Sequence, residues 1–221
     1  MTETKSTLVF SGLIGLAAAL LVGTGEYLLQ FSPTGGYGDP NYGWMASIPF
    51  ARLQMGHFLA ILAAPLYLIG YWHIGQMLKP AGPRLARLVT LLGGYGFMVG
   101  AVWIGQRAFL GITAAAIAQG TAQPELLHTM ASLNEPLVNV LRLVMVVVSL
   151  IWMVQIMRGQ TRYPRFMALF SPLLLLISIF VFFAWQPALG TYTVPTAMNT
   201  AHAVLFALST LVALMSKNDD T

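Results

Sequence analysis

The chain has 221 residues, of which 57% are hydrophobic and only 8% are charged. Because a soluble domain usually has about 25% charged residues, this composition excludes an ordinary soluble protein and indicates one embedded in lipid. The absence of cysteine excludes disulfides, cysteine-ligated metal centres and thiol catalysis. The net charge of +4 comes mainly from basic residues at the ends of apolar stretches, so it does not indicate a nucleic-acid site.

Six apolar stretches are long enough to cross a hydrocarbon core of ~30 Å. They span residues 7–30, 51–78, 85–119, 124–157, 165–186 and 195–216. We therefore expect an all-α fold, a polytopic bundle of six spanning helices that forms a single domain over residues 1–221. The first stretch is too long for the apolar part of a signal peptide, so we expect it to be retained. The third and fourth stretches predict long helices that tilt or project beyond the bilayer as a hairpin.

The connection at residues 32–49 is the longest and is rich in glycine, proline and aromatic residues. Glycine and proline favour turns, and Tyr37, Tyr42 and Trp44 suit the headgroup region of a membrane. This outer loop is either an ordinary interfacial connection or a lid.

Basic residues predict the orientation, because lysine and arginine accumulate on the cytoplasmic side of membrane proteins. If six helices alternate in direction, all but one of the basic residues that flank them fall on one side, and only Arg52 lies in the opposite loops. Both termini are therefore expected in the cytoplasm, together with Lys5, Lys79, Arg84, Arg87, Arg158, Arg162, Arg165 and Lys217.

Ionisable residues inside the apolar stretches cost roughly 2.5–3.5 kcal/mol each on insertion scales and usually face the interior of a bundle. This chain retains Glu26, His57, His73, Arg107, Glu135, Arg142 and His202. Counting ~1.5 Å per helical residue from the basic anchors places all of them in the outer third of the membrane except His73, which lies about 9 Å from the inner face.

Helical spacing suggests that these side chains converge. One helix face carries polar residues at spacings of four, three, four and three, namely His128, Ser132, Glu135, Asn139 and Arg142. Asn199 and His202 share a second face, and Gln54 and His57 share a third. Glycine and alanine on the first and third stretches favour close helix packing. We predict a polar chamber above a closely packed floor, lined by Glu26, Gln54, His57, Arg107, Glu135, Asn139, Arg142, Asn199 and His202.

Three segments carry a family resemblance: GEYLLQFSPTG, MGHFLAILAAPLYLIGYWHIGQ and GYGFMVGAVWIGQRA. They resemble an uncharacterised family of small bacterial multi-pass membrane proteins. The resemblance implies a bacterial inner membrane location and implies no chemistry.

The chamber predicts first a membrane-embedded enzyme, a hydrolase or acid–base catalyst acting on a lipid-like substrate. Histidine and carboxylate suit proton transfer, which makes Glu26, His57, Glu135 and His202 the catalytic candidates. Arginines and amides suit an anionic group of the substrate, which makes Arg107, Asn139, Arg142, Gln54 and Asn199 the binding candidates. A zinc variant would use His57, His128 and His202 with Glu26 or Glu135. This inventory is similar to that of alkaline-ceramidase-type hydrolases, but the chain has no HxxxH pair.

Other interpretations remain open. Glu26–Arg107 and Glu135–Arg142, the latter bridged by Asn139, could be structural ion pairs. A non-catalytic protein that binds membrane lipid or an anionic amphipathic molecule is a further hypothesis, as is a small transporter, although only His73 lies deep on the inner side. A b-type haem held by His57 and His202 is the last. The oligomeric state does not follow from the sequence.

Overall fold

The computed structural model describes residues 3–33, 36–39 and 41–216, so the predicted anchor Lys217 lies outside the described residues. Within these ranges every regular element is helical. The α-helices are α1 (Lys5–Gln30), α2 (Phe50–Ala63), α3 (Leu66–Leu78), α4 (Pro83–Ala118), α5 (Pro124–Met157), α6 (Pro172–Trp185), α7 (Pro187–Gly190) and α8 (Ala197–Met215). Short 3-10 turns lie at Gly43–Met45, Lys79–Ala81, Arg165–Phe170 and Val194–Thr196.

Five of the described segments are long and apolar enough to cross a membrane: Lys5–Gln30, Phe50–Ala81, Pro83–Ala118, Pro124–Met157 and Val194–Met215. The all-helical membrane fold is thereby confirmed. The second segment consists of α2 and α3, which are separated at Pro65, where the missing N–H interrupts the helical hydrogen bonds. The predicted stretch 165–186 is different, because its α-helix begins only at Pro172, capped by the Ser171 hydroxyl, and has 14 residues.

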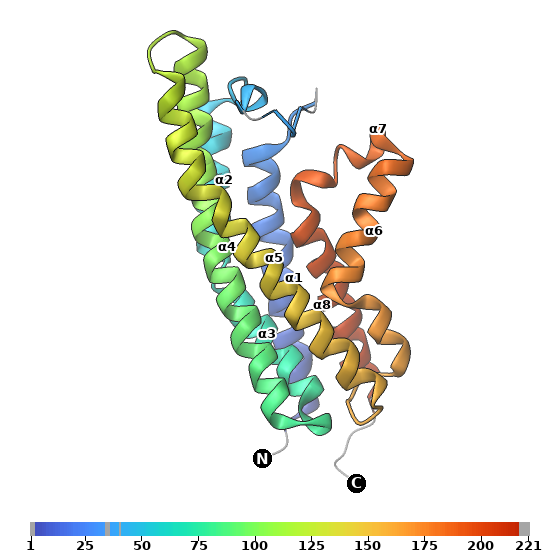
Figure 1. Ribbon diagram of the computed structural model, residues 1–221. Helices are drawn as coiled ribbons and strands as arrows, with labels where there is room; N and C mark the ends of the chain where they lie inside the picture. The colour runs from blue at the N-terminus through green and yellow to red at the C-terminus, as the bar shows by residue number, and fades with distance from the viewer. Residues whose placement is uncertain (1–2, 34–35, 40, 217–221) are drawn as a thin grey trace.

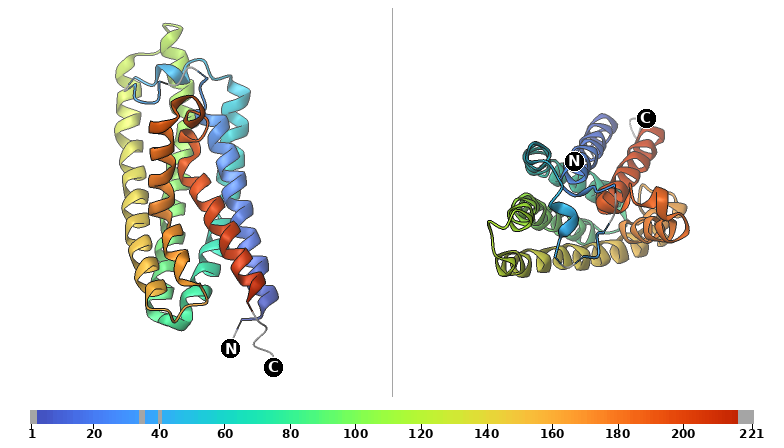
Figure 2. Two further views of the ribbon diagram at one scale, coloured as in Figure 1. Left: turned by 90° about the vertical axis from the view of Figure 1, so that its right-hand side faces the viewer. Right: turned by 90° about the horizontal axis from the view of Figure 1, so that it is seen from above.

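Figures 1 and 2 show an elongated bundle in which α1 packs against α2, α3 and α8, while α4 pairs with α5. The α4–α5 hairpin projects beyond the other helices (Figure 1), as expected for helices of 36 and 34 residues. The start of α1, the end of α8, the α3–α4 connection and the α5–α6 connection all lie at the bottom of Figure 1. We call this the basic end, because these parts of the chain carry Lys5, Lys79, Arg84, Arg87, Arg158, Arg162 and Arg165. The opposite end is called the pocket end.

Glycines allow α1 to approach its neighbours closely. A Cβ added at Gly15 would lie 2.9 Å from Gly70 Cα on α3 and 2.7 Å from the Phe206 ring on α8. A Cβ at Gly25 would lie 2.8 Å from the Gly56 carbonyl oxygen on α2. Backbones this close can be formed only by residues without a Cβ, so α1 is held at a fixed position below the pocket end.

The C-terminus of α1 is closed by Arg52, the arginine that the charge pattern left on the pocket end. Its guanidinium donates to the carbonyl oxygens of Tyr27, Leu28 and Phe31 at 3.4, 3.2 and 2.9 Å. A cation at a helix C-terminus satisfies carbonyl groups that lack helical partners and complements the helix dipole. Arg52 therefore fixes the last turn of α1, which carries Glu26 and Gln30.

Candidate functional site

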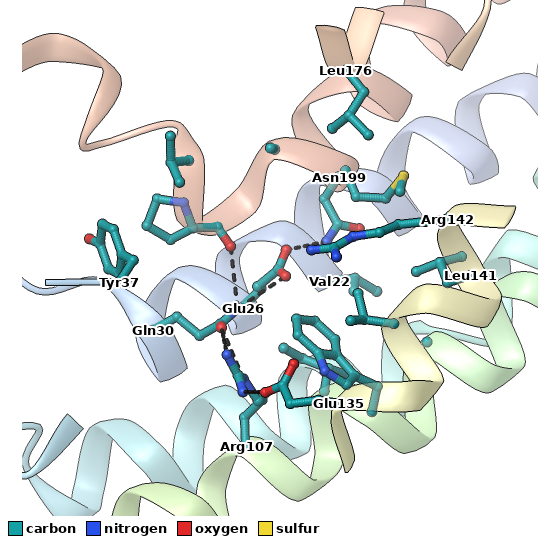
Figure 3. Close-up of a pocket in the computed structure, with 18 of the residues that line it drawn as sticks. Val22, Glu26, Gln30, Tyr37, Arg107, Glu135, Leu141, Arg142, Leu176 and Asn199 are labelled. Carbon is teal, nitrogen blue, oxygen red and sulfur yellow. Dashed lines mark hydrogen bonds and ion pairs between the residues drawn. The ribbon is translucent and has the colours of Figure 1, made fainter. Parts of the chain in front are cut away.

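A cavity of about 420 Å³ lies at the pocket end between α1, α4, α5, α6, α8 and the outer loop (Figure 3). We call it the pocket. Five predicted site residues line it: Glu26, Arg107, Glu135, Arg142 and Asn199. Small side chains contribute to its walls, including Ala64, Gly100 and Ala101.

Arg107 holds three parts of the pocket together. Its Nη1 pairs with Glu135 Oε1 on α5 at 2.5 Å, and its Nε and Nη2 donate to Gln30 Oε1 on α1 at 3.0 and 2.9 Å. The guanidinium carbon lies 4.8 Å from the Trp103 ring and 5.3 Å from the Tyr42 ring, within the range of cation–π contacts. Arg107 is thus already committed to protein partners, and its main role is to shape the pocket.

Glu26 is 6% exposed and is held by amides rather than by a cation. Asn199 Nδ2 donates to Oε2 at 2.6 Å and Gln30 Nε2 donates to Oε1 at 3.1 Å. Asn199 is itself oriented by Tyr67, whose hydroxyl donates to Asn199 Oδ1 at 2.7 Å. Among the described residues Glu26 has no ion-pair partner, since the one pair there joins Arg107 and Glu135.

In the described part of the chain, Arg142 is a cation of the pocket that lacks an anionic partner, whereas Glu26 is an anion that lacks a cationic one. Arg142 is an exposed residue of α5 that lines the pocket, and its Nη1 donates to Asn139 Oδ1 at 3.1 Å. Within the described ranges it pairs with no carboxylate. Figure 3 shows Arg142 reaching into the pocket from α5 while Glu26 enters from α1.

The described parts of the outer loop lie at the pocket end (Figure 2, right), and Tyr37, Asp39, Tyr42 and Trp44 line the pocket. The Tyr42 hydroxyl donates to Glu135 Oε1 at 2.5 Å. Burial and the neighbouring Glu135 carboxylate raise the pKa of Tyr42 to about 12, so below pH 10 this hydroxyl stays protonated and keeps its donor. Asp39 is occupied within the loop, where it accepts from the backbone N–H groups of Asn41 and Gly43 at 2.9 Å.

The side of the pocket between α5 and α6 is apolar. Val138 and Leu141 contribute from α5, and Leu176 and Phe180 contribute from α6. These two helices make few contacts with each other, because α6 packs mainly on α8. Phe180 is 46% exposed on the bundle surface. The pocket therefore joins a charged interior to an apolar wall that reaches the bundle surface.

Four of the predicted lining residues do not line the pocket. Gln54 and Asn139 are exposed, and His57 lies between α2 and α4 with Nδ1 2.9 Å from the Gly105 carbonyl oxygen. His202 is fully buried behind Phe97, with a ring separation of 4.7 Å. Depth and helical spacing show which residues share a height and a helix face, but not which face points into the pocket, and this is the reason for these errors.

The predicted three-histidine metal site is wrong for the same reason. His57 lies against Gly105 of α4, His202 lies against Tyr71 of α3 and Phe97 of α4, and His128 is exposed on α5. The described residues contain no group of three histidine, aspartate or glutamate side chains that could hold a metal. The Met198 carbonyl can only accept, so His202 Nδ1 donates to it at 2.8 Å and Nε2 accepts from the Tyr71 hydroxyl at 2.7 Å. Both ring nitrogens are thereby occupied, which leaves none for haem.

The predicted ion pairs are also corrected. Glu26–Arg107 and Glu135–Arg142 are replaced by Arg107–Glu135, with Glu26 bound to amides and Arg142 bound to Asn139. The missing partner in the prediction was Gln30, which lies four residues after Glu26 on the same helix face and accepts from Arg107. The same spacing of four residues places Trp103 beside Arg107 on α4, so the sequence could also have indicated this cation–π contact. No sequence signal indicated that Tyr42 would reach Glu135.

A second buried polar cluster lies nearer the basic end, where the sequence suggested a nearly apolar interior. His73 is fully buried, its Nε2 lies 2.6 Å from Ser209 Oγ, and that oxygen lies 2.6 Å from the Tyr163 hydroxyl. Ser11 Oγ approaches His73 Nδ1 at 3.4 Å. This cluster joins α1, α3, α8 and the α5–α6 connection. We call it the His73 cluster.

A protein-family model described as a family of unknown function (DUF6796) matches residues 4–217. The chain belongs to this family, because the match covers nearly its whole length. No curated protein and no solved structure matches the chain. The membership in an uncharacterised family that the three sequence segments suggested is confirmed, and the chemistry of the pocket follows from its geometry alone.

Proposed function

We propose that this protein binds a lipid-like amphipathic molecule in the pocket, with an anionic group at Arg142 and an apolar chain along the wall between α5 and α6. The observation that carries the proposal is the joining of a charged interior to this apolar wall in one cavity of about 420 Å³. Ligand cavities commonly have volumes of about 300–1,000 Å³, with mostly apolar walls and a few polar groups that set the orientation.

Unpaired donors support an acceptor-rich ligand group. Arg142 uses one guanidinium nitrogen on Asn139 and has further N–H groups for an incoming oxyanion. The indole nitrogens of Trp44 and Trp103, two residues that line the pocket, are buried and have no hydrogen-bond partner in the described part of the chain. A buried donor without a partner costs about 1–3 kcal/mol, so a ligand oxygen within reach would be favoured.

Binding without turnover is the function that the geometry supports best. The hydrolase hypothesis needs a histidine beside the substrate, but His57 lies outside the pocket and His202 is separated from it by Phe97. Glu26 and Glu135 do line the pocket, yet each is engaged in hydrogen bonds that hold helices together.

We also propose how the pocket is oriented in the membrane. The basic end would face the cytoplasm of a bacterial cell, with α6 and α7 forming a sixth crossing, so that the pocket opens in the outer half of the inner membrane. The course of α6 supports a sixth crossing, since α6 runs alongside the longer helices and α7 continues the chain at its end (Figure 2, left). The outer loop would act as a lid attached through Tyr42 and Glu135.

Lipid retention tests the proposal. The protein is purified in mild detergent from membranes, and native mass spectrometry counts the lipids that remain bound. We expect the wild type to retain about one anionic-group lipid, and Arg142→Gln to reduce its occupancy about tenfold. Arg84→Gln, an exposed arginine at the basic end, serves as the control and should retain the wild-type occupancy. Equal loss in both variants, or no retained lipid in the wild type, would contradict the proposal.

A further inference from the structure

The charged residues of the pocket indicate which group the ligand headgroup carries in addition to the anionic group bound at Arg142. Of the five charged residues that line it, Arg107 and Glu135 pair with each other, and Asp39 is bound by its own loop. Glu26 and Arg142 are left without oppositely charged partners in the described part of the chain. They enter the same cavity from α1 and α5 (Figure 3).

Resting on the binding function proposed above, we infer that the ligand headgroup is zwitterionic, a phosphate diester that also carries a primary ammonium, as in an aminophospholipid. Arg142 binds the phosphate oxygens, and Glu26 binds the ammonium. A carboxylate can accept about four hydrogen bonds, and Glu26 receives two from protein amides. An ammonium brings three donors and the missing positive charge.

The surroundings of Glu26 favour an ammonium from the ligand over a cation from the protein. Arg107 is the nearest candidate, but its Nε and Nη2 are bound to Gln30 and its Nη1 to Glu135. Gln30 and Asn199 both present N–H groups to the carboxylate, which fixes its orientation toward the cavity side. A carboxylate this buried that has no direct ion pair among the described residues is costly to keep charged, so a ligand ammonium bonded to Glu26 would contribute to affinity.

A lipid is favoured over a free small zwitterion because of the apolar wall. Leu141, Leu176 and Phe180 offer no polar group to a water-soluble ligand. They suit an acyl chain that leaves the pocket between α5 and α6. The chemistry of the headgroup is the same in both cases, so the experiment includes both sources.

The test compares headgroups in nanodiscs that contain equal amounts of phosphatidylethanolamine and phosphatidylglycerol, with bound lipid read by native mass spectrometry. We expect the wild type to retain phosphatidylethanolamine at least fivefold over phosphatidylglycerol, and Glu26→Gln to lower this ratio below twofold while total lipid retention persists. Glu125→Gln, an exposed carboxylate at the α5 N-terminus, should leave the ratio unchanged.

A wild-type ratio near one with lipid still bound would overturn the zwitterion inference and leave the proposed function standing. Loss of all specific retention would instead overturn the proposed function. A second measurement needs no variant: phosphatidylcholine, whose quaternary nitrogen has no N–H, should bind the wild type more weakly than phosphatidylethanolamine. Displacement of the lipid by millimolar soluble phosphoethanolamine would overturn the assignment to a lipid.

Discussion

Arg107 links α1, α4, α5 and the outer loop through one side chain. Its planar guanidinium provides donors in two directions, toward Gln30 and Glu135, while its face contacts Trp103 and Tyr42. Lysine has neither the fork nor the flat face. The position therefore requires arginine for its shape as well as for its charge.

We predict that Arg107→Gln lowers the free energy of unfolding by about 2 kcal/mol, because it leaves the buried Gln30 amide oxygen without its donors and removes the pair with Glu135, which partial exposure weakens. Arg107→Lys should restore only part of this loss. The control is Arg84→Gln, an exposed arginine at the basic end that has no ion pair among the described residues, which should change stability by less than about 0.5 kcal/mol. Denaturant unfolding in detergent, followed by tryptophan fluorescence, measures both. Equal stability of the two glutamine variants would contradict this account of Arg107.

Part of the pocket lining follows from the sequence. Helix length gave the depth of the polar side chains, and Glu26, Arg107, Glu135, Arg142 and Asn199 do line one cavity. Depth and helical spacing do not show which face of a helix points into the pocket. Gln54 and His57 therefore have suitable heights along their helix but point away from the pocket. The predicted ion pair between Glu26 and Arg107 does not form, because Arg107 donates to Gln30 instead.

At the scale of elements, the seam between α1, α3 and α8 combines close backbone packing with buried polar groups. Gly15 and Gly70 let α1 and α3 meet, and Phe206 of α8 fills the adjacent space. Below them the His73 cluster bonds the same three helices and Tyr163 of the α5–α6 connection. Polar contacts of this kind stabilise helix association in lipid, where apolar side chains have no preference for one another.

We predict that Ser209→Ala destabilises the fold by about 1–3 kcal/mol for each group left unpaired, which are His73 Nε2 and the Tyr163 hydroxyl. Burial raises the pKa of Tyr163, so this hydroxyl cannot relieve the loss by ionising near neutral pH. The control is Ser178→Ala, an exposed serine on α6 whose hydroxyl donates to the Leu175 carbonyl oxygen of its own helix. Thermal unfolding of both variants in detergent measures the difference. Equal melting temperatures would show that the cluster contributes no stability.

For the whole molecule, apolar periodicity and length predicted the helical membrane fold because lipid requires internally satisfied backbone hydrogen bonds. Five long segments agree with the structure. The remaining one could not be delimited from hydropathy, since Pro172 ends the preceding turn and restarts the helix inside a continuous apolar stretch. Hydropathy also carries no information about how α5 and α6 diverge around the pocket.

The absence of native cysteine makes the six-crossing orientation directly testable. We predict that a membrane-impermeant maleimide labels Thr121→Cys and Ala188→Cys in intact spheroplasts, and labels Gln160→Cys only after permeabilisation. These positions lie in the α4–α5 hairpin, in α7 and in the α5–α6 connection. If α6 does not cross the membrane, residues 160 and 188 will be labelled from the same side.

Photo-crosslinking from inside the pocket tests the central claim most directly. A photoreactive amino acid replaces Leu176, which lines the apolar wall, or Leu211, which is 50% exposed on α8, and mass spectrometry identifies the lipids attached in native membranes. Binding in the pocket predicts adducts at position 176 that are enriched at least fivefold in one headgroup class relative to position 211. Adducts with the same lipid composition at both positions, or none at 176, would contradict it.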